Sequence, residues 1–276
     1  MELSIPLFDG LSLRVADQSR DAGSYPTVRL QKGLLLSDGR EELAEEGVGF
    51  GVPILKRGVQ TIFPSEMELA SRRTGPLWEV TAVFAMDLVE RLAKPGGASL
   101  QSGVLYAAKD SLAALHRRVP PLRGPLTAAS ISLRRMFGWV TTYEPAKVRA
   151  ELTVTYTVAG EDGRIGVALD MTGLPADVTE VVVMNEQGAR HFDRYEDADG
   201  VTLQGDEIGT WNEVTAARAS FVSTTRGVAF SLGQVGGARL DRGRELIGSR
   251  VAWSGFGYSL SPTLERFGYD LWIERV

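Results

Sequence analysis

Residues 151–158 read Glu-Leu-Thr-Val-Thr-Tyr-Thr-Val, a strict alternation of polar and apolar side chains. Because successive side chains of a β-strand point to opposite faces, this alternation is typical of a strand with one buried and one exposed face. The β-branched residues in it favour the same structure. A turn cluster at 160–163 and a second apolar-rich stretch at 165–171 follow, which predicts a hairpin with a local, antiparallel connection.

The same rhythm of short strands and turns continues to the C-terminus. No segment of helical length separates them to make parallel crossovers, so we predict a mainly β fold, an antiparallel β-sandwich or supersandwich. Residues 80–92 fit strand and helix alike, and we favour a strand. The other expected strands are 3–7, 11–15, 27–30, 48–55, 59–63, 66–71, 180–184, 190–195, 201–203, 217–224, 227–232, 250–260 and 267–275.

Residues 102–140 interrupt this pattern with apolar side chains at helical spacing, which predicts a short helical insertion. Its arginines suit an anionic partner, although a solvated helix edge is the favoured interpretation. Two organisations are open. Either one large β-sandwich domain spans residues 1–276, or two β-rich domains occupy 1–101 and 147–276.

Composition excludes several classes of chemistry. The chain of 276 residues has no cysteine and two histidines, which excludes thiolate nucleophiles, disulfides and sites built on three histidines. We predict no metal and no cofactor. The net charge of −5 argues against nucleic-acid binding. No export signal and no apolar run of membrane-spanning length is visible, so we expect a cytoplasmic protein with no membrane partner.

Aromatic residues and glycines recur together near the C-terminus, at 253–258 and 267–272. Aromatic rings stack against the apolar faces of sugars, which makes Trp253 and Tyr258 candidate substrate-binding residues. Trp211, from an irregular stretch, is a third candidate. Packing in the core is the competing interpretation for all three rings.

The stretch Gly47-Val-Gly-Phe-Gly-Val-Pro53 lacks the preceding strand and following helix of a phosphate-binding loop. A strand whose glycines allow another backbone or a ligand to approach closely is the favoured interpretation. Arg57 lies just beyond it and is a candidate to contact hydroxyl or anionic groups of a substrate.

His191 falls in the expected strand 190–195, and Glu207 and Glu213 lie in the irregular stretch beyond it. A histidine and a carboxylate held together can transfer protons, so these three residues are the candidate catalytic residues. A partly exposed histidine without a role is the competing interpretation.

Two acidic clusters are interpreted structurally. The segment 195–206 has aspartates and a glycine at some offsets of a calcium loop, but Tyr195 occupies the first ligand position, so a hairpin turn is favoured. The second cluster has helical spacing and is interpreted as a short, solvent-exposed helix face, formed by Glu41, Glu42, Glu45 and Glu46.

The many sequential antiparallel strands and aromatic-rich late strands, chiefly over residues 147–276, resemble the galactose mutarotase-like β-supersandwich superfamily. The resemblance is one of architecture, without a diagnostic motif, and no catalytic residue is carried over from it. It implies a carbohydrate-binding or carbohydrate-processing β-sandwich protein with a saccharide ligand, in which His191 or His116 would serve any histidine chemistry. The alternative is a non-catalytic structural or protein-interaction module that assembles as a homo-oligomer.

Overall fold

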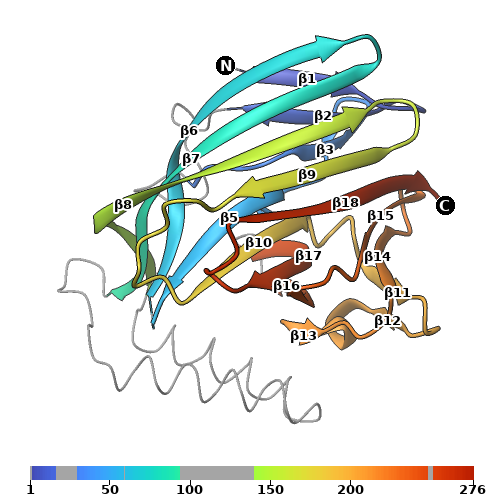
Figure 1. Ribbon diagram of the computed structural model, residues 1–276. Coiled ribbons are helices and arrows are strands. Elements are labelled where there is room, and N and C mark those ends of the chain that lie inside the picture. Colours follow the sequence, from blue (N-terminus) through green and yellow to red (C-terminus); the bar gives the residue numbers. More distant parts are fainter. Residues whose placement is uncertain (1, 17–29, 59, 94–139, 248–250) are drawn as a thin grey trace.

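The computed structural model describes residues 2–16, 30–58, 60–93, 140–247 and 251–276. Strands dominate these ranges, and the predicted mainly β fold is confirmed (Figure 1). Within the described ranges the one helical element is a short 3-10 turn, η3 (Gly205–Ile208). The helical insertion expected at 102–140 falls outside the described residues, except that Val140 begins a strand.

The strands are β1 (Glu2–Pro6), β2 (Leu11–Ala16), β3 (Leu35–Asp38), β4 (Glu41–Glu42), β5 (Gly49–Arg57), β6 (Gln60–Thr74), β7 (Leu77–Ala93), β8 (Val140–Ala159), β9 (Arg164–Asp170), β10 (Glu180–Gln187), β11 (Arg194–Asp197), β12 (Thr202–Gln204), β13 (Asn212–Glu213), β14 (Arg218–Ser223), β15 (Val228–Gly233), β16 (Ala238–Ile247), β17 (Val251–Leu260) and β18 (Arg266–Arg275).

Two antiparallel sheets make up the fold. The small sheet has the order β1-β2-β3-β4, and the large sheet has the order β12-β11-β14-β15-β18-β9-β8-β7-β6-β5-β10-β17-β16-β13. The small sheet lies behind β6, β7, β8 and β9 in Figure 1, so that two layers of strands face each other. One apolar cluster lies between them and draws side chains from both sheets, among them Leu13, Leu36, Phe84 and Tyr156.

The hairpin from which the fold was predicted is confirmed. β8 and β9 pair antiparallel, with Thr153 opposite Asp170 and Val158 opposite Ile165. Over residues 152–158 the apolar side chains are buried and the threonines between them are half-buried, as the period of two requires. The ambiguous stretch 80–92 lies in β7, a strand as expected.

β7 and β8 pair from Leu77 opposite Ala159 to Met86 opposite Ala150 and, after an irregularity, from Leu88 opposite Pro145 to Ala93 opposite Val140. The large sheet is therefore continuous across strands that precede and follow the chain segment 94–139. Whether the chain is one domain or two stays a prediction.

The glycine-rich stretch forms the start of β5, and its glycines allow close approach, as expected. Gly51 has φ 77°, in the left-handed region that favours glycine. A Cβ atom at this position would lie 2.6 Å from Cε1 of Tyr156. The buried Tyr156 hydroxyl donates to Phe50 O at 3.0 Å, so the ring is fixed directly over the backbone of β5.

Tyr156→Phe removes this hydroxyl and leaves the Phe50 carbonyl without its buried donor from β8. We expect the free energy of unfolding to fall by about 1 to 2 kcal/mol, because a buried hydrogen-bond partner is lost with no water to replace it. Urea denaturation followed by tryptophan fluorescence measures the change. A loss below about 0.3 kcal/mol would show that the bond between β8 and β5 contributes little.

Candidate functional site

The end of β10 lies against a crossing segment, residues 43–48, that leads from the small sheet into β5. Gly188 N donates to Leu43 O at 2.8 Å. A Cβ atom on Gly188 would lie 2.5 Å from Oε2 of Glu45, so a glycine is needed for the segment to approach this closely. The contact brings the glutamates of the crossing segment onto the turn that follows β10.

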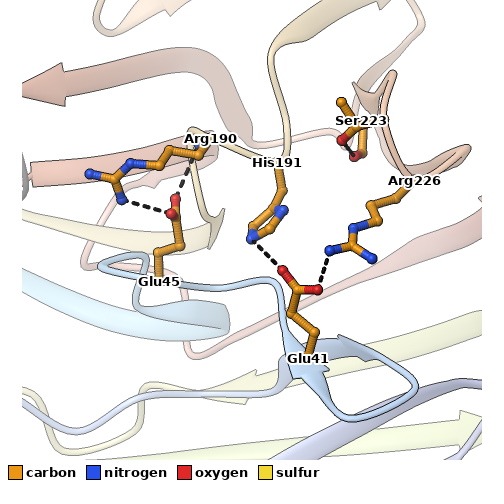
Figure 2. Close-up of polar contacts among 7 residues, drawn as sticks. Glu41, Glu45, Arg190, His191, Ser223 and Arg226 are labelled. Atoms are coloured by element: carbon orange, nitrogen blue, oxygen red, sulfur yellow. Dashed lines mark hydrogen bonds and ion pairs between the residues drawn. The ribbon is translucent and has the colours of Figure 1, made fainter.

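Figure 2 shows two carboxylates that point toward this turn, Glu41 from β4 and Glu45 from the crossing segment. Glu45 accepts hydrogen bonds from Arg190 N at 3.1 Å and from Arg190 Nη1 at 2.7 Å. Glu41 is ion-paired with Arg226, and its Oε1 lies 3.9 Å from Nε2 of His191. The polar group therefore joins the small sheet to two turns of the large sheet.

The acidic cluster of Glu41, Glu42, Glu45 and Glu46 does not form the predicted helix face. Glu41 and Glu42 form the strand β4, which pairs with β3. Glu45 has φ 47°, a left-handed conformation that ends any regular element there. Helical spacing was therefore the wrong interpretation, because three of the four side chains contact or ion-pair with groups far away in the sequence. Those three are Glu41, Glu42 and Glu45.

Glu45→Gln keeps the shape of the side chain and removes its charge. The carboxylate is 16% exposed and accepts one charge-assisted bond, so we expect a loss of about 1 kcal/mol in the free energy of unfolding. Glu161→Gln, in an exposed turn, is the matched control and should lose nothing measurable. Equal urea midpoints for the two variants would contradict a stabilising role for Glu45.

An aromatic pair is formed by Trp211, in the loop before β13, and Trp253 of β17. The rings of Trp211 and Trp253 are stacked, with centroids 4.9 Å apart and an interplanar angle of 19°. Trp211 lies over the glycines of β16 and β17: a Cβ on Gly257 would lie 3.2 Å from its Cζ3, and one on Gly243 would lie 3.0 Å from its backbone nitrogen. Trp211 has φ 54°, an uncommon conformation for a non-glycine residue. Both rings are partly exposed.

A buried carboxyl group shares this sheet face with the aromatic pair. Glu186 of β10 is opposite Gly255 of β17, two residues from Trp253. It is 5% exposed, and burial raises its pKa to about 8, with a further rise from the nearby Glu245 carboxylate. Glu186 is therefore largely protonated at neutral pH, unlike an ordinary glutamate.

Lys32, in the segment before β3, is a cation whose charge acts on this carboxyl. Its ammonium donates to the backbone oxygen of Glu45 at 2.8 Å. Burial lowers the pKa of Lys32, and the acidic groups of Glu42, Glu46 and Glu186 oppose that shift. Lys32 thus links the crossing segment to the charges around Glu186.

The predicted catalytic residues lie on three different elements. His191 lies in the turn after β10, since β11 begins at Arg194 rather than at 190 as expected. Glu207 is exposed in η3, where its carboxylate accepts from Gln204 N at 3.5 Å. Glu213 is exposed in β13. Among the described residues the acidic neighbour recorded for His191 is Glu41.

Of the predicted binding residues, the structure brings Trp211 and Trp253 together and places the others elsewhere. Tyr258 is fully buried, and its hydroxyl donates to Gly233 O, so this ring belongs to the core. Arg57 lies at the end of β5 and is ion-paired with Asp177. Core packing, the competing interpretation, fits Tyr258, while Trp211 packs against the buried side chains of Val52, Ile54 and Met184 and keeps part of its surface exposed.

Sequence reasoning missed Glu186 because the expected strand ended at residue 184. β10 instead continues through Gln187, and three consecutive polar side chains are buried: Asn185, Glu186 and Gln187. Asn185 accepts from Tyr269 Oη at 2.7 Å and Gln187 accepts from Leu36 N at 3.1 Å. The available signal was a polar triplet that directly continues an apolar strand.

Comparisons with known proteins show a similarity of fold and assign the chain to no family. No family model and no curated protein matches the chain. Among solved structures, the chain is similar to the α-N-acetylgalactosaminidase NagBb from Bifidobacterium bifidum in complex with GalNAc, with a TM-score of 0.51 and 10% identity. That match covers 99% of this chain and 36% of the galactosaminidase, so the chain spans about a third of that enzyme.

Proteins of the class that the sequence resembles are also among the solved structures found. A galactose mutarotase-like protein from Lactobacillus casei has a TM-score of 0.40 at 10% identity, and 99% of each chain is covered. A putative aldose 1-epimerase from Escherichia coli K12 has a TM-score of 0.39 at 8% identity, and the whole of each chain is covered. At the level of fold, the chain is a β-sandwich of a kind found in carbohydrate-processing enzymes.

Within the described ranges, no helix has the length and apolar character needed to span a membrane. Nor do three histidine, aspartate or glutamate side chains in that part of the chain gather in an arrangement that could hold a metal ion.

Proposed function

We propose that this protein binds a saccharide on the sheet face that carries the stacked pair Trp211 and Trp253. The single observation that carries the proposal is the geometry of this pair. The two indole rings are stacked and partly exposed, and Trp211 lies against glycines of β16 and β17. Sugar rings present apolar C–H faces that stack on such aromatic surfaces.

The polar surroundings support the same ligand. A saccharide needs hydrogen-bond donors and acceptors beside the stacking surface, because its hydroxyls lose water on binding. Glu186 and Glu245 lie on the same sheet face as Trp253. The fold likeness to the galactosaminidase is consistent with a carbohydrate ligand, although it is a likeness of fold alone.

The conformation of Trp211 favours a binding role over a purely structural one. A tryptophan at φ 54° costs about 1 kcal/mol or more in backbone strain, and such strain is often retained at ligand sites. Trp211 also packs against the buried side chains of Val52, Ile54 and Met184, while part of its surface stays exposed.

Titration calorimetry with galactose, mannose and N-acetylgalactosamine, supported by a glycan array, tests the proposal. We expect binding of at least one of these sugars, and a loss of about tenfold or more in affinity for Trp253→Ala, because one stacking surface is removed.

Trp272→Ala is the matched control, since Trp272 is a partly exposed tryptophan on β18 that stacks with Arg218 outside the proposed site. It should bind as the wild-type protein does. If no sugar binds, or if both tryptophan variants lose affinity equally, the proposed site is wrong. Either result would favour the alternative, a non-catalytic interaction module.

A further inference from the structure

We propose that Glu186 is a specificity-determining residue of this saccharide site, where as an uncharged carboxylic acid it donates a hydrogen bond to a sugar oxygen while the Glu245 carboxylate accepts one from a sugar hydroxyl. The inference rests on the proposed function. It assigns to the site a donor that the sequence, with its acidic composition, does not suggest.

The register of the strands places the two carboxyl groups beside the aromatic pair. Glu186 is opposite Gly255, and Glu245 is opposite Trp253. Residues opposite one another, and residues two apart on one strand, point to the same face of a sheet. Gly255 is in turn opposite Gly243, so no side chain from these two positions stands between the carboxyl groups and the indole rings.

The hydrogen bonding of Glu186 leaves capacity for a ligand. Among the described residues its carboxyl has one hydrogen bond, from Val48 N to Oε2 at 3.4 Å, which is long for an N–H···O bond. A protonated carboxyl has one O–H group, which forms a second hydrogen bond when an acceptor is in reach. A sugar oxygen that accepts the proton of Oε1 would supply this second bond.

The charges around Glu186 decide its protonation state. Glu245 faces it from β16 and favours the neutral form, while Lys32 faces it from the segment before β3 and favours the ionised form. Desolvation is the largest influence, and together with Glu245 it prevails over Lys32 and the bond from Val48 N, so that burial holds the pKa of Glu186 at about 8. The acid is therefore available as a donor below this pH and is lost above it.

The proposal predicts that saccharide binding weakens at high pH, and that the isosteric variant Glu186→Gln removes this pH dependence. We measure calorimetric affinity for galactose, mannose and N-acetylgalactosamine at pH 6.5 and pH 9.5. For the wild-type protein we expect a loss of about tenfold or more at the higher pH, because a donor is exchanged for a charged acceptor. Glu186→Gln should change less than about twofold, because an amide donates at both pH values.

Two controls separate this proposal from the proposed function. Glu161→Gln, in an exposed turn, should keep the wild-type pH dependence. Circular dichroism at pH 9.5 establishes that each protein is folded under the conditions of the titration. The carboxyl carbon of Glu186, followed by NMR in the unliganded protein, should titrate near pH 8 and not near its ordinary pKa.

The outcomes are distinct. Binding that depends on Trp253 but is equally strong at both pH values in the wild-type protein overturns the role of Glu186 and leaves the saccharide site standing. A Glu186 carboxyl that titrates below pH 6 overturns it without any ligand. The absence of sugar binding at pH 6.5 overturns the proposed function, and this inference with it.

Discussion

Glu186→Gln is expected to be more stable than the wild-type protein at pH 8 and above, and to lose most of the decline in stability that the wild-type protein shows between pH 4.5 and pH 8. The pKa of this glutamate is about 4.5 as an ordinary group and is raised by burial to about 8 in the folded state. Between those values the unfolded chain has released the proton while the folded protein still holds it. Stability must therefore fall as the pH rises through this window.

The size of the effect follows from the same shift. Each unit of difference in pKa corresponds to about 1.4 kcal/mol, so the wild-type protein should lose on the order of 4 to 5 kcal/mol across the window, less any relaxation of the site. Glutamine does not titrate and should remove this contribution. Urea denaturation at pH 5, 7 and 9 measures it.

Glu161→Gln serves as the control, because its carboxyl is exposed. Its pH dependence should match that of the wild-type protein. If the curves of wild type and Glu186→Gln run parallel from pH 5 to pH 9, then Glu186 is ionised in the folded protein and the environment described for it is incorrect.

Gly51→Ala is expected to destabilise the protein by about 3 kcal/mol or more, enough to prevent folding at 37 °C if the wild-type stability is ordinary. The residue has φ 77°, and a Cβ atom would lie 2.6 Å from Cε1 and 2.9 Å from Oη of Tyr156. Neither group can move freely, because the tyrosine is buried and hydrogen-bonded to β5. Backbone strain and overpacking therefore add together.

Gly39→Ala separates these two contributions. Gly39 has a similar φ of 62°, but a Cβ atom there would have no neighbour within 4 Å. This variant should lose only the cost of the left-handed conformation, about 1 to 2 kcal/mol. Thermal and urea unfolding of both variants give the comparison. Equal losses would mean that the contact with Tyr156 is not restrictive.

Local periodicity predicted most of the strands, because a strand with one buried face has apolar residues at every second position. The alternation at 151–158 identified β8 and its hairpin with β9. The same reasoning ended β10 too early at Met184, because a run of polar residues normally marks a turn. Here Asn185 and Gln187 are buried and bond to side chains or backbone from distant segments, which periodicity cannot reveal.

The candidate site was predictable in its residue types more than in its geometry. Trp211 and Trp253 were selected as aromatics, but their stacking depends on a loop that folds back over β16 and β17. His191 was paired in prediction with Glu207 and Glu213, whereas the structure places Glu41 beside it, 150 positions earlier in the chain. The single-domain organisation, the cytoplasmic location and self-association stay predictions.

Ala93 and Val140 are 47 positions apart in the chain and yet are opposite one another in neighbouring strands. The entropy needed to close a connection grows only with the logarithm of its length, so this long separation adds little to the cost of pairing β7 with β8. The two strands are held in register by their own backbone hydrogen bonds and buried side chains, and a tight turn is not required for that pairing.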